Sequence, residues 1–535
     1  MTAPVAIVGN GPVGQTAALL LARRGVPSLV LDQRSHRDPV GSKAICQHRD
    51  VLDIWDSVGV GRTVADEGVT WSTARTFYRD QELFATDFID RGHSPFPPFV
   101  NISQSRTEQL LDQQLDQESD VDVRWSHEVI DIEQDESGVD LTCRTAGGPV
   151  RVRAGYVLMC AGPSANELRS QLDVRFDGHS FDDKFLICDI RADLGSWATE
   201  RRFYFDPEWN PGRQVLIHPC PDRTYRIDWQ VPPEYDVEQE ARSGALDERI
   251  RKIVGSAPYE IVWRSVYRFH SRLVDRMKVG RVLLAGDVAH LMAPFGARGL
   301  NSGVQDAENA AWKLAYVHHG WAPPALLDSY HAERHAAAVE NLDVTSTTMA
   351  FLVPQTPDEA DFRTATLRHA ASDAAARSRV DSGRLAEPFW YVQSPLTTPD
   401  PTRPFAGRPP RGYSPDPGPG VLVPDLPIAP SGQATRLRQL AREGLLVVTG
   451  PGVPPEPAGT VARARTAAPV RSVAANDLVA DGATGSVAST LGMRDGEMWL
   501  IRPDGHVAAV VSDLDALAAA ATRVLGHDPQ EVEPA

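Results

Sequence analysis

A glycine-rich turn near the start of the chain has the residue types that bind a pyrophosphate. It follows the apolar run 5–8, precedes an expected helix at 15–24 and has the pattern GxGxxG. Its glycines are Gly9, Gly11 and Gly14. Glycines allow a phosphate to approach the backbone N–H groups at the positive end of a helix. Asp32 follows the next apolar run, about 20 residues on, where a carboxylate accepts hydrogen bonds from an adenosine ribose. The pattern predicts a dinucleotide site, with an ordinary glycine turn as the alternative, and does not distinguish FAD from NAD.

Two further motifs follow a strand-like run at 281–285. The first, GDVAH, spans 286–290, and the second, PFGARGLN, spans 294–301 and leads into a helix expected from Ser302. With these motifs the chain resembles the class A flavoprotein monooxygenases, which have the para-hydroxybenzoate hydroxylase fold. The resemblance covers residues 1–345 and implies that the bound dinucleotide is FAD. A glycine loop that caps an ordinary helix is the alternative for the second motif.

The resemblance assigns roles to individual residues. In that family the aspartate of the GD motif, here Asp287, holds the ribityl chain, and the glycine-rich segment places backbone N–H groups beneath the flavin pyrimidine. Reduced flavin is anionic around N1 and C2=O, and a helix N-terminus with Arg298 nearby stabilises that charge. Gln104 matches a glutamine that contacts FAD, with a surface amide as the alternative, and Lys43 stands where the family usually has arginine. The predicted FAD-binding residues are Gly9, Gly11, Pro12, Val13, Gly14, Asp32, Gln33, Arg34, Lys43, Gln104, Asp287, Gly296, Gly299, Leu300 and Asn301.

The resemblance also places the reacting ring between the flavin and an antiparallel sheet. Arg226 matches a family arginine that reaches the flavin from the second of two adjacent strands. His218, on the strand before it, falls where the family directs a polar side chain at the substrate. An imidazole with a pKa near ~6.5 could help remove a phenolic proton; a strand histidine bonded to a neighbour is the alternative. We predict His218, Arg226 and Pro294 as catalytic residues. Predicted substrate contacts, with a plain core role as the alternative, are Tyr204, Tyr225 and Trp229.

One motif of the family is incomplete. An Asp-Gly pair should follow the strand-like run 156–160, but Ala161 occupies the aspartate position and only the glycine remains. In the family that aspartate is associated with both FAD and NAD(P)H. Its replacement is therefore expected to weaken the binding of the electron donor, NADPH or NADH, more than the binding of FAD, which has two other binding motifs. The cations that could supply a replacement contact are Arg169, Arg298 and Lys43.

These motifs need a fold that brings them together. The βαβ start, the buried-strand pattern at 281–285 and the β-branched and aromatic segments between them predict an α/β fold. We expect a Rossmann-type FAD-binding domain with an inserted antiparallel β-sheet substrate domain. The expected divisions are FAD-binding parts at 1–172 and 281–393, the substrate domain at 173–280 with a contribution from 71–104, a Pro/Gly-rich linker at 394–430 and a C-terminal module at 431–535.

The C-terminal module has the pattern of a small α/β unit that ends in a hairpin with an Asp-Gly turn and a helix. It resembles the thioredoxin-like module of the phenol hydroxylase and 3-(3-hydroxyphenyl)propionate hydroxylase branch. The module contains no CxxC pair, so dithiol chemistry is excluded and a packing or dimer role is expected.

Composition limits the partners. The chain has 535 residues and a formal net charge of −17, which leaves no basic stripe for nucleic acid. Its five cysteines have no metal-binding spacing, so no metal site is predicted. No charged leader or long apolar segment precedes the first strand, so we expect a cytoplasmic protein without a membrane partner. A homodimer is left open.

The predicted function is that of an FAD-dependent monooxygenase that hydroxylates a phenolic or other aromatic compound with NAD(P)H and O2. The resemblance implies that a flavin C4a-hydroperoxide attacks the ring, so the protein must exclude water and favour the phenolate. Two alternatives stay open. One is a Baeyer–Villiger or epoxidising monooxygenase that acts on a polyketide or an aromatic antibiotic, and the other is an FAD-binding subunit without catalytic activity. An NAD-dependent dehydrogenase would not need the motifs at 286–290 and 294–301.

Overall fold

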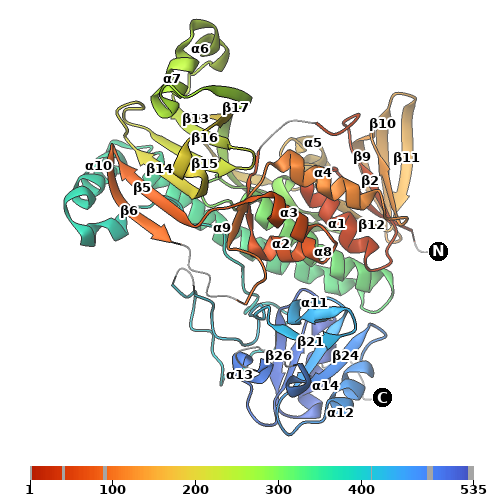
Figure 1. Cartoon of the computed structure of the whole chain (residues 1–535). Coiled ribbons are helices and arrows are strands. Elements are labelled where there is room, and N and C mark those ends of the chain that lie inside the picture. The colour runs from red at the N-terminus through yellow and green to blue at the C-terminus, as the bar shows by residue number, and fades with distance from the viewer. Residues whose placement is uncertain (1–2, 39–42, 88–92, 411–412, 479–485, 528–535) are drawn as a thin grey trace.

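A six-stranded sheet forms the centre of the first domain. The computed structural model describes residues 3–38, 43–87, 93–410, 413–478 and 486–527 (Figure 1). The strand order is β18-β19-β12-β1-β2-β8, and the five strands from β19 to β8 run parallel. The strands are β1 (Val5–Val8), β2 (Ser28–Leu31), β8 (Val121–Arg124), β12 (Tyr156–Met159), β18 (Lys278–Val279) and β19 (Val282–Leu284). The four central strands are buried throughout, which explains their continuous apolar sequence.

Helix α1 (Pro12–Ala22) joins β1 to β2 and packs against α4 (Gln104–Leu115) and α8 (Gly299–His318). It begins before the expected residue 15, because the fixed φ of Pro12 suits the first position of a helix. The helix expected from Ser302 likewise begins earlier, at Gly299. The other helices of this part of the chain are α2 (Arg49–Asp56), α3 (Gly61–Glu67), α5 (Asn166–Gln171), α9 (Asp328–Leu352) and α10 (Pro357–Ser372).

An eight-stranded sheet forms the second layer, in the order β20-β17-β13-β16-β15-β14-β5-β6. All neighbours are antiparallel except β14 and β5, which run parallel. The strands are β5 (Thr73–Tyr78), β6 (Gln81–Asp87), β13 (Phe176–Ala192), β14 (Glu200–Phe205), β15 (Gln214–Cys220), β16 (Thr224–Val231), β17 (Tyr259–Val274) and β20 (His290–Leu291). Helices α6 (Val237–Ser243) and α7 (Ala245–Val254) join β16 to β17 at the outer end (Figure 1). The predicted inserted antiparallel sheet is confirmed.

Two three-stranded sheets complete this part of the molecule. Strands β9 (Glu128–Gln134), β10 (Val139–Thr145) and β11 (Gly148–Ala154) form one, and β3 (Cys46–His48), β4 (Val69–Thr70) and β7 (Phe99–Asn101) form the other. Short 3-10 turns are η1 (Gly195–Thr199), η2 (Gly286–Val288), η3 (Pro324–Leu327), η4 (Ala374–Arg379) and η5 (Ala475–Leu478).

The C-terminal module contains a four-stranded sheet in the order β24-β23-β25-β26. Its strands are β23 (Leu445–Thr449), β24 (Val470–Ala474), β25 (Met498–Ile501) and β26 (Val507–Val511), preceded by the hairpin β21 (Pro427–Ser431) and β22 (Ala434–Arg436). Its helices are α11 (Leu437–Ala441), α12 (Pro455–Arg463), α13 (Val487–Leu491) and α14 (Leu514–Val524). Gly505, with φ +80°, makes the predicted Asp-Gly turn between β25 and β26.

The module is packed against the long helix of the first domain. The aromatic side chains of Trp312 and Tyr316, both on α8, belong to the same apolar core as residues of β23, β25, α12 and α14. Figure 1 shows the module, in blue, beneath α8. Within the described ranges, none of the helices is both long and apolar enough to cross a membrane. The tertiary structure is therefore an α/β fold with an inserted antiparallel sheet and a docked α/β module.

Candidate active site

A cavity of about 1030 Å³ lies between the parallel and the antiparallel sheets. Its size is at the upper end of the range of about 300–1,000 Å³ for small-molecule sites, as an extended cofactor together with a substrate requires. All predicted FAD-binding residues except Gly14 line it. Those that line it are Gly9, Gly11, Pro12, Val13, Asp32, Gln33, Arg34, Lys43, Gln104, Asp287, Gly296, Gly299, Leu300 and Asn301. The fold thus brings together motifs that lie almost 300 residues apart in sequence.

The N-terminus of α1 opens into this cavity and fits a pyrophosphate. Gly9 has φ +105°, and a Cβ there would lie 2.4 Å from the carbonyl oxygen of Cys160. A Cβ on Gly14 would lie 2.0 Å from the carbonyl oxygen of Gly9. A Cβ on Gly11 would meet no atom of the described chain within 4 Å, because this residue borders the open cavity. Since no described side chain caps α1, its first N–H groups are available to an anion.

Asp32 is held in place beside that helix end. Its carboxylate accepts hydrogen bonds from the backbone N–H groups of Asn10 at 2.7 Å and Arg34 at 2.8 Å, and it pairs with the Arg34 guanidinium at 2.9 Å. Burial raises the pKa of Asp32, but the hydrogen bonds from Arg34 and Asn10 outweigh it, so the net shift is downward. The carboxylate is therefore ionised at the cavity wall, where it can accept hydrogen bonds from a ribose.

The N-terminus of α8 and the loop 286–290 form another wall of the cavity. Gly296 has φ +117°, and a Cβ there would lie 2.3 Å from a backbone oxygen, whereas Gly299 borders open space. Within the described chain no side chain caps α8, so its N–H groups can stabilise negative charge. The Asp287 side chain is exposed to the cavity, and the surrounding protein raises its pKa by desolvation. Both features fit a flavin whose ribityl chain lies at Asp287.

Two predicted cofactor residues use their side chains to build the cavity wall. Arg298 donates to the backbone oxygens of Arg384 at 3.2 Å and Leu385 at 3.1 Å. Asn301 accepts a hydrogen bond from the backbone N–H of His48 at 2.9 Å. Their side chains join α8 to neighbouring segments, so these contacts within the protein occupy part of their hydrogen-bonding capacity.

Gln104, at the start of α4, contacts the backbone beside Lys43, and both residues line the cavity. The Gln104 side chain accepts from the backbone N–H of Ala44 at 3.0 Å, and the carbonyl oxygen of Lys43 accepts from Arg226 at 3.1 Å. The Lys43 side chain is exposed. These contacts fix the backbone around Lys43 while its cation stays in contact with solvent at the cavity.

Three polar side chains form a row across the face of the antiparallel sheet that closes the cavity. Arg201 on β14, His218 on β15 and Arg226 on β16 all line it, as does Pro294. His218 lies directly opposite Arg226 in the sheet register, and the register of β14 with β15 places Arg201 beside His218. Arg226 is buried and pairs with Asp228 at 2.9 Å. The row therefore places two guanidinium groups beside one imidazole, with Asp228, which also lines the cavity, as the counter-ion of Arg226.

The pKa of His218 is held well below its ordinary value, first by burial and then by the charges of Arg201 and Arg226. Its Nδ1 has no hydrogen-bond partner within the described chain. The expected pKa near ~6.5 is thus corrected: the imidazole is neutral and a weaker base than a free histidine. The charged groups of the row are its two guanidinium groups, Arg201 and Arg226, rather than the imidazole.

The predicted substrate contacts Tyr204, Tyr225 and Trp229 do not line the cavity. They belong to the apolar core on the opposite face of the sheet. The physical reason is the alternation of side chains along a strand: Arg226 faces the cavity, so residues 225 and 229 face away from it. Sequence reasoning missed Arg201, which the same alternation could have revealed. Along β14, Arg201 faces the same side of the sheet as Phe203 and Phe205, and Tyr204 faces the other side.

The incomplete Asp-Gly motif also lines the cavity, at Ala161. Arg169 does not replace the missing contact, because its guanidinium donates to the backbone oxygens of Val288 at 3.1 Å and Pro163 at 2.9 Å. Arg169 thereby joins this loop to the GD-motif loop. Of the three cations expected to compensate, only Lys43 has an exposed side chain at the cavity.

A dinucleotide site that opens onto a polar face of an antiparallel sheet fits the arrangement expected of a flavoprotein monooxygenase. The chain belongs to the FAD binding domain family, whose model matches residues 2–345, and residues 416–528 match the family described as aromatic-ring hydroxylase, C-terminal. The predicted FAD cofactor and the predicted branch of aromatic hydroxylases are confirmed. The chain is an enzyme, an FAD-dependent monooxygenase, as its relatives are.

Individual relatives agree with this assignment. A flavin-dependent monooxygenase of Mycobacteroides abscessus is 32% identical over 64% of this chain and 73% of its own length. A 3-(3-hydroxy-phenyl)propionate/3-hydroxycinnamic acid hydroxylase of Mycobacterium sp. (strain JLS) is 29% identical over 64% of this chain and 59% of its own length. The fold matches the crystal structure of the flavin-dependent monooxygenase PieE in complex with FAD and substrate, with a TM-score of 0.84 and 24% identity over 98% of both chains.

Proposed function

We propose that this monooxygenase hydroxylates a phenolic ring that binds between FAD and the row Arg201, His218 and Arg226. The observation that carries the proposal is that this row lines the same cavity as the FAD-binding motifs. A buried pair of guanidinium groups stabilises a phenolate, the form of the ring that is most reactive toward an electrophilic oxygen. Pro294, also at the cavity, contributes a rigid wall beside the substrate.

The proposed orientation of FAD follows the two helix ends. The pyrophosphate lies at the N-terminus of α1, with Asp32 at the adenosine ribose, and the flavin lies at the N-terminus of α8 beside Asp287. Bound FAD supplies hydride acceptance and oxygen activation. The chain's own contributions are the positive end of α8, which holds negative charge on the ring system, and the two sheets, which exclude water from the reacting atoms.

His218 takes part in the proton balance of the substrate. The imidazole is neutral and lies between two cations. It can therefore accept a hydrogen bond from the phenolic O–H without itself becoming charged. Arg201 and Arg226 then favour loss of that proton. Under this proposal, loss of the row raises the pKa of the bound phenol and lowers the rate of ring hydroxylation more than it weakens FAD binding.

The test is anaerobic stopped-flow reduction of the bound FAD by NADH and by NADPH, with and without a panel of phenols. Reduction accelerated by a phenol, followed by a product with oxygen on the ring after O2 is admitted, supports the proposal. No reduction under any of these conditions contradicts it. A product with oxygen inserted into a C–C bond or across a double bond would favour the Baeyer–Villiger or epoxidising alternative. The cytoplasmic location and the homodimer remain predictions.

A further inference from the structure

Glu333 and Arg334 are neighbours on α9, yet their side chains face different parts of the molecule. Arg334 donates to Asp306 at 2.6 Å and to the Tyr391 hydroxyl at 2.9 Å. Glu333 accepts from Arg502 of the C-terminal module, at 3.0 Å in one of two contacts. All five side chains are buried. One turn of α9 therefore contacts both the first domain and the module.

Asp306 continues the connection to the FAD-binding loop. Its Oδ2 accepts from the backbone N–H of Gly286 at 3.0 Å and from His290 Nε2 at 2.7 Å, while its Oδ1 accepts from Arg334. Gly286 has φ +70° and precedes Asp287. Asp306 thus holds both ends of the loop 286–290 whose aspartate opens into the cavity. Burial raises the pKa of Asp306, but Arg334 and His290 outweigh it and lower the pKa to about 2, so the carboxylate stays charged.

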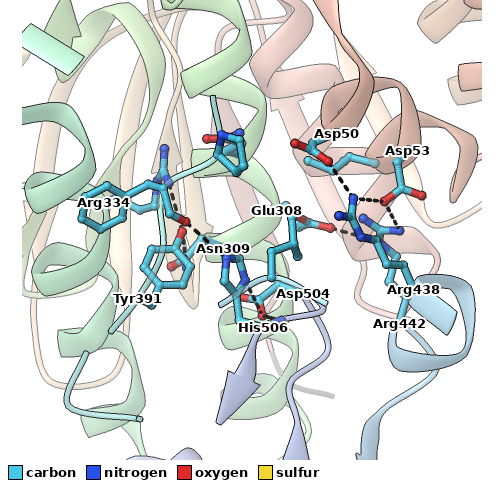
Figure 2. A pocket seen from close by; sticks show the side chains of 15 residues that line it. Asp50, Asp53, Glu308, Asn309, Arg334, Tyr391, Arg438, Arg442, Asp504 and His506 are labelled. Carbon is cyan, nitrogen blue, oxygen red and sulfur yellow. Dashed lines mark hydrogen bonds and ion pairs between the residues drawn. The ribbon is translucent and has the colours of Figure 1, made fainter. Parts of the chain in front are cut away.

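The module supplies its side of the connection from a single hairpin turn. Arg502 pairs with Asp504 across the turn, and Asp504 accepts from Trp312 Nε1 of α8 at 3.2 Å. The ring of His506 packs against Tyr391 with centroids 4.3 Å apart. Figure 2 shows Tyr391 between Arg334 and His506. The turn is the sequence RPDGH at 502–506, and no step of the proposed chemistry uses it.

The charges in this connection balance. The network contains three cations, Arg334, Lys313 and Arg502. It contains as many carboxylates: Asp306, Glu333 and Asp504. Lys313 Nζ donates to Glu333 at 2.6 Å. A buried network of this kind is costly to desolvate and fixes geometry only when all its members are satisfied. Its ion pairs and hydrogen bonds join the module to α9, and α9 to the loop 286–290, in addition to the apolar packing of the interface.

The module has a separate anchor, so this network is not needed merely to attach it. Arg438 pairs with Asp50 at 2.6 Å, and Arg442 pairs with Asp53 at 2.9 Å and with Glu308 at 3.0 Å. Figure 2 shows this second group on the other side of a small cavity of about 30 Å³. These ion pairs lead to α2 and the middle of α8, and none of them reaches Asp306.

We propose that the turn 502–506 of the C-terminal module positions the FAD-binding loop 286–290, through a relay formed by Glu333, Arg334, Tyr391 and Asp306. The module then supports the cofactor site from outside the cavity, through the positions of residues in the first domain. The inference rests on the proposed place of FAD beside Asp287. The relay residues are positioning residues, because none of them lines the cavity that contains the FAD-binding motifs.

The first test compares two tyrosine-to-phenylalanine variants. Tyr391→Phe removes the hydroxyl that accepts from Arg334 and Asn309. Tyr316→Phe is the matched control: Tyr316 is buried at the same interface, and its hydroxyl has no hydrogen-bond partner in the described residues. We expect Tyr391→Phe to raise the FAD dissociation constant of the apoprotein between about twofold and tenfold, as the loss of one net hydrogen bond implies, and to change the visible circular dichroism of bound FAD. Tyr316→Phe should change neither.

A second variant tests the module side while it keeps the buried charges balanced in number. Lys313 and Asp504 lose Glu333 and Arg502 as partners, but they have opposite charges, and Asp504 lies close enough to raise the pKa of Lys313. The pair Glu333→Gln with Arg502→Met removes one anion and one cation together, and should also weaken FAD binding and change its dichroism while the apoprotein stays folded. Unchanged FAD affinity in both this pair and Tyr391→Phe, or an equal loss in Tyr316→Phe, would overturn the relay.

Asp287→Ala separates the two proposals. If this variant binds FAD as tightly as the wild type, the proposed place of FAD is wrong and the relay has nothing to position. If Asp287→Ala loses affinity while the relay variants keep it, only the relay is wrong. Loss in all of them, with Tyr316→Phe unaffected, supports both proposals.

Discussion

Gly11 provides a sharp test of where the pyrophosphate binds. Its φ of −86° suits any residue, and a Cβ there would meet no described atom within 4 Å. Gly11→Ala should therefore fold normally, yet its methyl group would project toward the space in which a phosphate must approach the N–H groups of α1. Gly14→Ala would instead place a Cβ 2.0 Å from the carbonyl oxygen of Gly9 and should disturb the fold itself.

The size of the effect follows from the contacts that the methyl group blocks. A hydrogen bond to a charged group contributes about 1.5–3 kcal/mol, and about 1.4 kcal/mol corresponds to a tenfold change in affinity. Loss of one such bond should weaken FAD binding by about 10- to 150-fold. The melting temperature of the apoprotein should stay within about 2 °C of the wild type, which corresponds to under about 1 kcal/mol.

The assay is titration of the apoprotein with FAD, followed by quenching of flavin fluorescence. Gly147→Ala is the control, because Gly147 lies in an exposed turn and a Cβ there would meet only the Thr145 hydroxyl, at 3.8 Å. A dissociation constant for Gly11→Ala within about twofold of the wild-type value, well short of the loss of one charged hydrogen bond, would refute the placement of the pyrophosphate at α1.

Three further predictions concern the antiparallel sheet and the incomplete motif. Trp229→Phe should lower the free energy of unfolding by about 1–3 kcal/mol and leave the substrate KM unchanged, because Trp229 is fully buried in the core away from the cavity; a marked rise in KM would return it to the substrate site. The pKa of His218 is lowered in the folded protein, so as the pH falls below about 6.5 the imidazole takes up a proton in the unfolded chain before it does so in the folded protein. In urea unfolding the wild type should therefore lose up to about 1.4 kcal/mol of stability per pH unit relative to His218→Asn. Parallel pH profiles of the two proteins would contradict this. Ala161→Asp should speed anaerobic flavin reduction at low NAD(P)H by restoring the family's carboxylate, and an unchanged rate would show that Ala161 does not limit the donor step.

Local patterns were sufficient to predict which residues line the cavity at the N-termini of α1 and α8. The turn at Gly9 and the segment before α8 depend on backbone conformations that only glycine adopts easily, with φ +105° at Gly9 and φ +117° at Gly296. Such constraints act within a few residues, so they are legible in sequence. The sheet face toward the cavity was predicted less well: Arg226 and His218 line the cavity, but Tyr204, Tyr225 and Trp229 lie on the other side of the sheet. Their aromatic side chains suggested a contact with the substrate, but the alternation of side chains along a strand decides which face of the sheet each residue occupies.

The sequence by itself determined the class of fold and the order of the motifs, because both depend on short runs whose residue types restrict the backbone or alternate with a fixed period. FAD as the cofactor followed from the resemblance of these motifs to those of the flavoprotein monooxygenases. Only the tertiary structure decided which charges meet. Arg201 joins His218 and Arg226 through strand register, and Arg502 reaches Glu333 across 169 residues. Contacts of this kind arise from the packing of whole elements, and a buried charge finds its partner through that packing rather than through its neighbours in the chain.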